Sequence, residues 1–258
     1  MPDDHPRGRE QSQLRPMRAS RPSASLRSML ATTAKPPAVP RSCHPVLDRV
    51  GALAGIAHAL LVPIGFSVFA AGTSEFVDLT STRAEIAAEF ARPARTVIWV
   101  GGFIEVCAFL LFLLFAARLW AELRAAEGAP GWLSATVLIS ASTLVGVGLV
   151  SFTVGAATYI QAGHLDTNVA VALTDVRSFA FHLNAGVAAL FLTAVAGVGL
   201  AYRALPRTLG WTAAALAPLL VSAMALPRSD FSQTPPLLML LWVLAVSVTL
   251  LRRPGSTS

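Results

Sequence analysis

An apolar run over residues 96–120, TVIWVGGFIEVCAFLLFLLFAARLW, most constrains how this chain can fold. A stretch of about 20 apolar residues is long enough to cross the hydrocarbon core of a bilayer as a helix. This run carries one carboxylate, Glu105, inside the crossing. Apolar runs of the same kind stand before and after it. The sequence therefore predicts a polytopic membrane protein.

The composition supports a chain that exposes apolar surface to lipid. Of its 258 residues, 54% are hydrophobic and 13% are charged, whereas soluble domains carry about 25% charged residues. A soluble core could not bury this much apolar surface, so the excess is expected to face lipid. The net charge of +6 lies mainly in an N-terminal tail and in short loops, which is typical of membrane topology rather than of nucleic-acid binding.

The predicted fold class is all-α, a bundle of six transmembrane helices with a short amphipathic outer helix. A capping box, Thr82-x-x-Glu85, predicts this short helix over residues 83–91. Residues 1–49, rich in Arg, Pro and Ser, are expected to be a disordered basic cytoplasmic tail. Residues 50–253 form the predicted transmembrane domain, and 254–258 a short cytoplasmic end. The predicted spans cover residues 50–71, 96–119, 132–160, 177–202, 209–226 and 235–251.

The distribution of basic residues predicts the orientation. Most of the 20 Lys and Arg residues fall in the tail, in the loops after the second and fourth spans and at the C-terminal end. These segments all lie on one side of a six-span topology. By the positive-inside rule, the chain is expected in the plasma membrane with both termini cytoplasmic.

Three ionisable residues lie inside the predicted spans: His58, Glu105 and His182. Ionisable groups in a membrane are costly, so each suggests a functional role. Glu105 and His182 are expected near the same outer surface and would meet if their helices pack together. His58 enters from the cytoplasmic side and is expected to lie deeper than either.

The fourth predicted span gathers polar residues on one face. Asp175 and His182 share a face at about 100° per residue, and Asn184 falls on the opposite face. One interpretation is an outward-opening polar pocket built from Glu105, His182 and Asp175, which binds a small polar ligand or relays protons. The other interpretation is that Glu105 is a buried, hydrogen-bonded residue that serves helix packing.

The sequence contains no recognised catalytic signature. It has no Gly-x-Ser-x-Gly, no His-Glu-x-x-His and no P-loop, and only two cysteines, Cys43 and Cys107. His58 and His182 are expected at different depths, which disfavours a haem between them. We therefore expect no metal and no cofactor, and we favour a non-enzymatic protein. A membrane subunit of a multi-protein transporter and, less favoured, an intramembrane lipid-modifying enzyme are the alternatives. A homo-oligomer and a partner membrane subunit both stay open.

Several segments, taken in order, resemble those of a group of uncharacterised six-helix bacterial membrane proteins, of the domain-of-unknown-function type. The resemblance is carried by GALAGIAHALLVPIGFSVF, TRAEIAAEF, ARLWAELRAAEG-x-PGWLSA, VALTD, ALPRTLGW and LLWVLAVSVTLLRR. It covers roughly residues 48–253. The resemblance implies a six-helix architecture and implies no catalytic residues.

Overall fold

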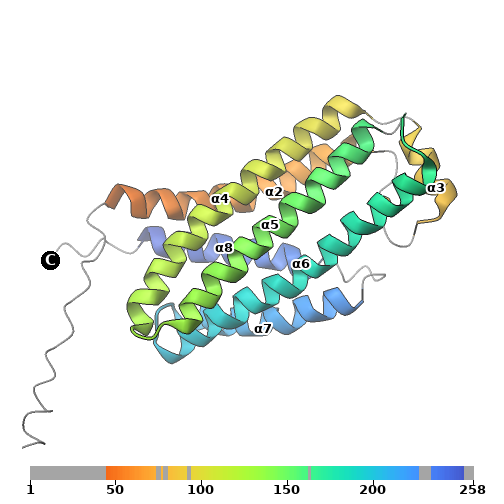
Figure 1. Ribbon diagram of the computed structural model, residues 1–258. Helices are drawn as coiled ribbons and strands as arrows, with labels where there is room; N and C mark the ends of the chain where they lie inside the picture. Colours follow the sequence, from red (N-terminus) through yellow and green to blue (C-terminus); the bar gives the residue numbers. More distant parts are fainter. Residues whose placement is uncertain are drawn as a thin grey trace, which may run out of the picture. The chain divides into compact units, whose positions relative to one another are not determined.

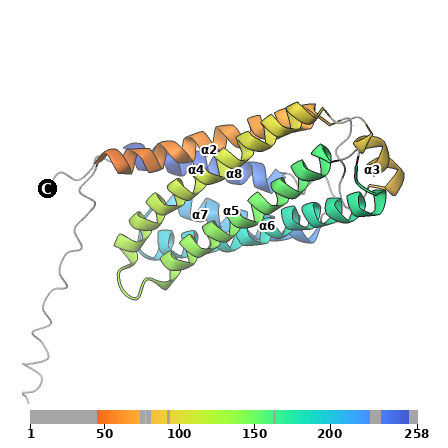
Figure 2. The same cartoon turned by 45° about the horizontal axis from the view of Figure 1, so that its top comes forward.

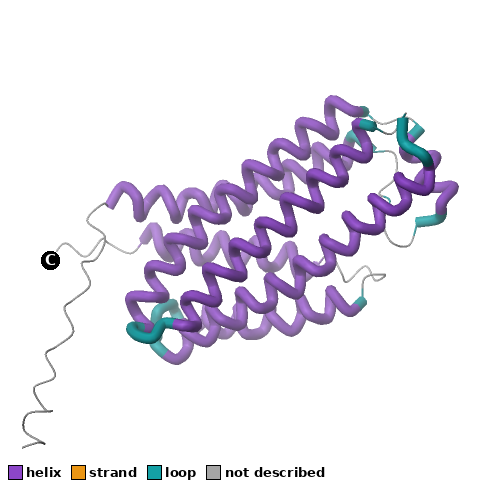
Figure 3. The backbone as a smooth tube through the Cα atoms, viewed as in Figure 1, coloured by secondary structure: helices purple, strands orange, loops and turns teal. Residues whose placement is uncertain are grey.

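The computed structural model describes residues 45–73, 77, 81–91, 94–161, 164–226 and 234–252 (Figure 1). Within these residues every regular element is a helix, so the predicted all-α class is confirmed (Figure 3). Six of the described helices are long and apolar enough to cross a membrane, and the seventh, α3, is short. The helices are α2 (Pro45–Ala71), α3 (Arg83–Phe90), α4 (Arg95–Glu127), α5 (Trp132–Ile160), α6 (Thr167–Ala201), α7 (Arg207–Ala225) and α8 (Thr234–Arg252).

The six long helices form a closed ring of neighbours. Contacts run from α2 to α4, α5, α6, α7 and α8 in turn, and α8 contacts α2 again (Figure 2). A further contact joins α4 to α6 across the bundle. Buried apolar side chains from all six helices fill the centre of the ring as one core. The ring is therefore a packed bundle whose outer surface offers apolar side chains to lipid.

Glycines allow α2 and α4 to pack closely. A Cβ added at Gly51 would lie 2.5 Å from the Arg118 Cβ, and one at Gly72 would lie 2.6 Å from the Ile98 Cγ1. A Cβ added at Gly101 would meet the backbone of α2, at 2.5 Å from the Phe69 nitrogen. Small residues let membrane helices approach until their backbones touch, which strengthens dispersion contacts between them.

The two largest errors in the predicted helix bounds concern α4 and α6. The second predicted span, residues 96–119, continues as α4 to Glu127, because the polar residues that follow the apolar run are still good helix formers. The fourth predicted span, residues 177–202, begins ten residues earlier as α6, where Asp166 caps the helix by accepting from the Asn168 amide at 2.8 Å. Polar residues do not end these two helices: α4 continues to its C-cap, Gly128, and α6 begins after its N-cap, Asp166.

The N-terminal bound also differs. Helix α2 begins at Pro45, so the last five residues of the predicted tail are helical. The remaining predicted tail, residues 1–44, and the predicted C-terminal end, 254–258, lie outside the described residues.

A tight connection joins α4 to α5. Glu127, the last residue of α4, accepts from the amides of Leu133 at 3.0 Å and Ser134 at 2.7 Å. The carboxylate thereby caps the first turn of α5, whose own N-cap, Gly131, has no side chain to do so and adopts a positive φ of 69°. This cap aligns α4 and α5 as antiparallel neighbours.

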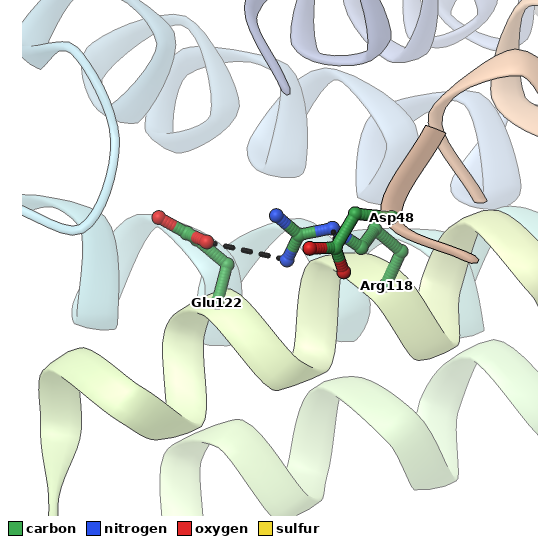
Figure 4. A network of polar contacts seen from close by, with 3 residues as sticks. All are labelled: Asp48, Arg118 and Glu122. Carbon is green, nitrogen blue, oxygen red and sulfur yellow. Dashed lines mark hydrogen bonds and ion pairs between the residues drawn. The ribbon is translucent and has the colours of Figure 1, made fainter. Parts of the chain in front are cut away.

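An ion-pair network ties the same end of α4 to the start of α2 (Figure 4). Arg118 lies 3.2 Å from Asp48 of α2 and 3.2 Å from Glu122, one turn further along α4. The arginine stem passes over Gly51, where a side chain would block it. The network therefore depends on the close packing of α2 against α4.

Helix α3 covers the opposite end of the bundle. Its predicted capping box is present: the Thr82 hydroxyl accepts from the Glu85 amide, and Glu85 accepts from the Thr82 amide. Ile86 and Phe90 pack in a second apolar cluster with residues of α2, α4, α5 and α6. Through its contact with α6, α3 lies over the ends of the long helices at this side, which we call the α3 end.

Candidate functional site

Glu105 is the most deeply buried carboxylate of the described chain. Its side chain is 1% exposed, and neither carboxylate oxygen has a hydrogen-bond partner among the described residues. It lies against the backbone of α2, where a Cβ added at Gly65 would be 3.2 Å from the Glu105 Cδ. A buried polar group without a partner costs about 1–3 kcal/mol or more, and such groups are rare in native structures. The position therefore calls for a functional explanation.

Helix α6 contacts α4 across the bundle and runs in the same direction as α4 (Figure 1). The rings of Phe112 on α4 and Phe191 on α6 meet at a centroid distance of 5.6 Å. Glu105 precedes Phe112 by two helical turns, and Asn184 precedes Phe191 by the same number of residues. Residues at this spacing lie on nearly the same face of a helix. Asn184 therefore lies at about the same level of the bundle as Glu105.

Asn184 shares two properties with Glu105. It is half-buried, and its Oδ1 is shielded from solvent without a hydrogen-bond partner in the described part of the chain. The two residues therefore put three buried oxygen acceptors at one level of the bundle. The sequence predicts Asn184 on the opposite face of the helix from His182. In the structure both residues lie in one continuous helix, α6, so this prediction is confirmed.

His182 points to another side of α6. It precedes Asn184 by two residues, so the two side chains point about 160° apart around the helix. Its Nδ1 donates to the Ser178 carbonyl at 2.7 Å, and its Nε2 is buried without a partner among the described residues. His182 and Asn184 therefore do not point toward the same neighbour of α6.

His58 lies on α2 near the middle of α4. It is buried, its Nδ1 donates to the Ala108 carbonyl at 2.8 Å, and its ring packs against Phe112 at a centroid distance of 4.8 Å. Since its contact is Ala108, His58 lies about one turn further from the α3 end than Glu105. Its remaining nitrogen, Nε2, is left as an acceptor in the neutral ring.

Asp175 is exposed on α6. Its carboxylate therefore stands at the surface of the bundle rather than beside Glu105. Helix α6 begins well before the predicted start, so Asp175 lies in its third turn instead of in a loop. No group of three or more Cys, His, Asp and Glu side chains in the described residues has a metal-binding arrangement.

Three residues that the sequence did not single out form a polar cluster under α3. Arg177 of α6 places its guanidinium 5.2 Å from the centre of the Phe69 ring. Tyr159 of α5 interacts electrostatically with Arg177 and with Glu89 of α3, which is 3% exposed. Arg177 precedes Asn184 by seven residues and lies on the same stripe. This spacing of seven residues is the sequence feature that could have identified Arg177.

Beyond His58, on the side away from α3, the residues that point into the bundle are aromatic rather than polar. On the side away from α3, the facing positions are taken by the buried aromatic residues Phe112, Phe115, Phe191 and Trp242. The rings contact one another, for example Phe191 and Trp242 at 6.2 Å between centroids. The buried charged side chains Glu105 and Glu89 thus lie in the half of the interior near α3, beside the second apolar cluster, and aromatic side chains fill the other half.

Comparison of the chain with protein-family models, with curated proteins and with solved structures finds no match in any of the three. The resemblance to uncharacterised six-helix bacterial membrane proteins stays a prediction.

Proposed function

We propose that this protein binds a small polar molecule inside its helix bundle, between Glu105 of α4 and Asn184 of α6. The observation that carries the proposal is the Glu105 carboxylate, buried at 1% exposure with both oxygens unpartnered among the described residues. Ionisable residues held inside a membrane bundle commonly contact a substrate, an ion or a proton path. The favoured role is therefore binding, or binding followed by transport.

The chemistry of the two side chains narrows the class of ligand. An ionised Glu105 only accepts hydrogen bonds, and the free atom of Asn184 is its acceptor Oδ1. A ligand with hydrogen-bond donors, above all an amine or ammonium group, would satisfy all three oxygens. A charged donor would also neutralise the buried carboxylate, and charge-assisted hydrogen bonds are the stronger kind.

Access from the α3 end is supported by the order of polar residues along the bundle. Arg177 lies nearest the α3 end, Asn184 and Glu105 share the next level, and the aromatic cluster follows. In this conformation the aromatic half closes the interior beyond His58. The arrangement supports entry from the α3 end past the apolar cluster under α3, and transport would also require the aromatic half to rearrange.

We infer that the α3 end faces outward and that the protein lies in the plasma membrane. The basic termini and the loops after α4 and α6 support this orientation through the positive-inside rule. Exposed Trp132 begins α5, and exposed Trp211 and Trp99 lie near the starts of α7 and α4. Tryptophan is enriched at both membrane surfaces, which suits these positions.

The orientation is tested with a membrane-impermeant thiol reagent on intact cells. Ser81→Cys, just before α3, is expected to label from outside, whereas the native Cys43 reacts only after lysis. Labelling of Cys43 in intact cells together with protection of the introduced thiol would reverse the orientation.

The binding site is tested by native mass spectrometry of the purified protein together with its absorption spectrum. A retained small molecule is expected in the wild type and is expected to be lost in Glu105→Gln and in Asn184→Leu. Asp175→Asn applies the same acid-to-amide exchange at an exposed position of α6 and is expected to retain the ligand. Loss in Asp175→Asn alone would move the site to the outer surface of α6. Retention in both Glu105→Gln and Asn184→Leu would contradict the proposal.

A further inference from the structure

A groove of about 470 Å³ runs between α4 and α5, away from Glu105. Gly102 and Ala156, both buried, lie at its base, and exposed Trp99 and Phe103 stand at its rim. A Cβ added at Gly102 would find only the Ala156 Cβ within 4 Å, at 3.8 Å. The groove is thus open space left by small residues between two neighbouring spans.

The position of the groove determines what it meets. Helices α4 and α5 are adjacent members of the ring, and both are candidate membrane spans. A groove in the outer wall between them opens toward the hydrocarbon of the bilayer. Its lining is almost wholly apolar, so a hydrocarbon chain matches its surface. Its volume lies within the range of about 300–1,000 Å³ that is typical of ligand sites.

One end of the groove is polar. Gln161, the C-cap of α5, lines it near the α3 end. Arg95, the first residue of α4, is exposed and lies one turn before Trp99, on the same face of the helix. Because α4 and α5 are antiparallel, the two polar side chains stand at the same membrane surface. An arginine there matches a phosphate group, which it binds through paired hydrogen bonds.

We propose that the groove between α4 and α5 is a binding site for an anionic phospholipid, with one acyl chain against Gly102 and Ala156 and the headgroup phosphate at Arg95. The apolar length and the single basic end together select a lipid over a water-soluble ligand. The site is separate from the proposed interior site at Glu105, and neither depends on the other.

The experiment is native mass spectrometry of the full chain with phosphatidylglycerol or phosphatidylcholine of identical acyl chains. The wild type is expected to retain phosphatidylglycerol about fivefold better, the factor that corresponds to about 1 kcal/mol for one basic side chain near an anionic surface. Arg95→Gln is expected to abolish this preference and to keep a bound lipid. Equal retention of the two lipids by the wild type would overturn the assignment of the headgroup.

Filling variants test the acyl-chain position. Gly102→Leu fills the base of the groove, and Thr153→Trp, at an exposed position of its lining, fills it from α5 without adding to the core. Both are expected to lose the bound lipid of either class. Gly146→Leu is the matched control, because Gly146 is exposed on α5 outside the groove and has no neighbour within 4 Å. Thermal unfolding of each variant confirms that it is folded.

Two results would overturn the proposal. One is an undiminished lipid adduct in Thr153→Trp. The other is a dimer in the wild type that Thr153→Trp dissociates, which would make a second copy of the chain the occupant of the groove.

Discussion

Gly101→Ala is expected to lower the folded yield and the melting temperature of the protein, whereas Gly102→Ala, one residue later, leaves both unchanged or improved. A Cβ at Gly101 would lie 2.5 Å from the Phe69 nitrogen and 2.7 Å from its Cα. These atoms are backbone, so α2 as a whole must move. At Gly102 the nearest atom is 3.8 Å away, which is ordinary van der Waals contact.

The size of the effect follows from two opposed terms. Overpacking a close-packed interior costs about 1–3 kcal/mol and more where the backbone must shift. The better helix propensity of alanine returns about 1 kcal/mol at both positions. Gly101→Leu is expected to leave almost no folded protein, because its larger side chain meets the same backbone.

The measurement is analytical size exclusion and thermal unfolding in detergent for the pair of alanine variants. A Gly101→Ala variant as stable as Gly102→Ala would show that α2 does not pack on α4 at this distance.

Glu105→Met is expected to raise the melting temperature of the ligand-free protein by about 5 °C or more. Methionine has a similar length without branching, so it fits against Gly65 and removes two buried oxygens that have no partner among the described residues. Relieving such a group returns about 1–3 kcal/mol. In a chain of this size, each 1 kcal/mol shifts the melting temperature by about 2–4 °C. Glu105→Gln keeps the polarity without the charge and is expected to be at least as stable as the wild type.

Glu105→Met and Glu105→Gln together separate a functional carboxylate from a structural one. Gain of stability with loss of the retained ligand is the trade-off expected of a residue kept for function. The control is Cys107→Ser, a small change two residues away on the same helix. Its melting temperature and its retained ligand are expected to stay near those of the wild type. A fall of several degrees in both Glu105 variants would show that the carboxylate holds the fold through a partner, and the packing interpretation would replace binding.

Much of the architecture could be read from hydrophobic periodicity, because each span must bury or shield its own backbone hydrogen bonds in lipid. The third span, residues 132–160, has the predicted bounds, since Gly131 precedes it and the apolar run ends with it. The ends of α4 and the start of α6 could not be read in this way. There the helix leaves the apolar region and continues in polar sequence, and side-chain caps at Asp166 and Glu127 decide the connections.

In the candidate site, too, the sequence predicts some features and not others. Glu105 was found because a carboxylate in an apolar run is conspicuous, and His58 was found for the same reason. The burial of Glu89 could not be predicted from the sequence. Helix α3 is short and polar, and which of its faces is buried depends on the helices that it covers.

The sequence by itself determined the helical class, the number of spans, the short capped helix at one end and the identity of the costly buried carboxylate. These follow from local chemistry: hydropathy, helix periodicity and capping. Only the tertiary structure decided which residues lie at the level of Glu105. The contact of Phe112 with Phe191 sets the register between α4 and α6, and that register puts Asn184 at the level of Glu105, with His182 on another side of α6. Register between helices distant in sequence depends on packing, and no local pattern encodes it.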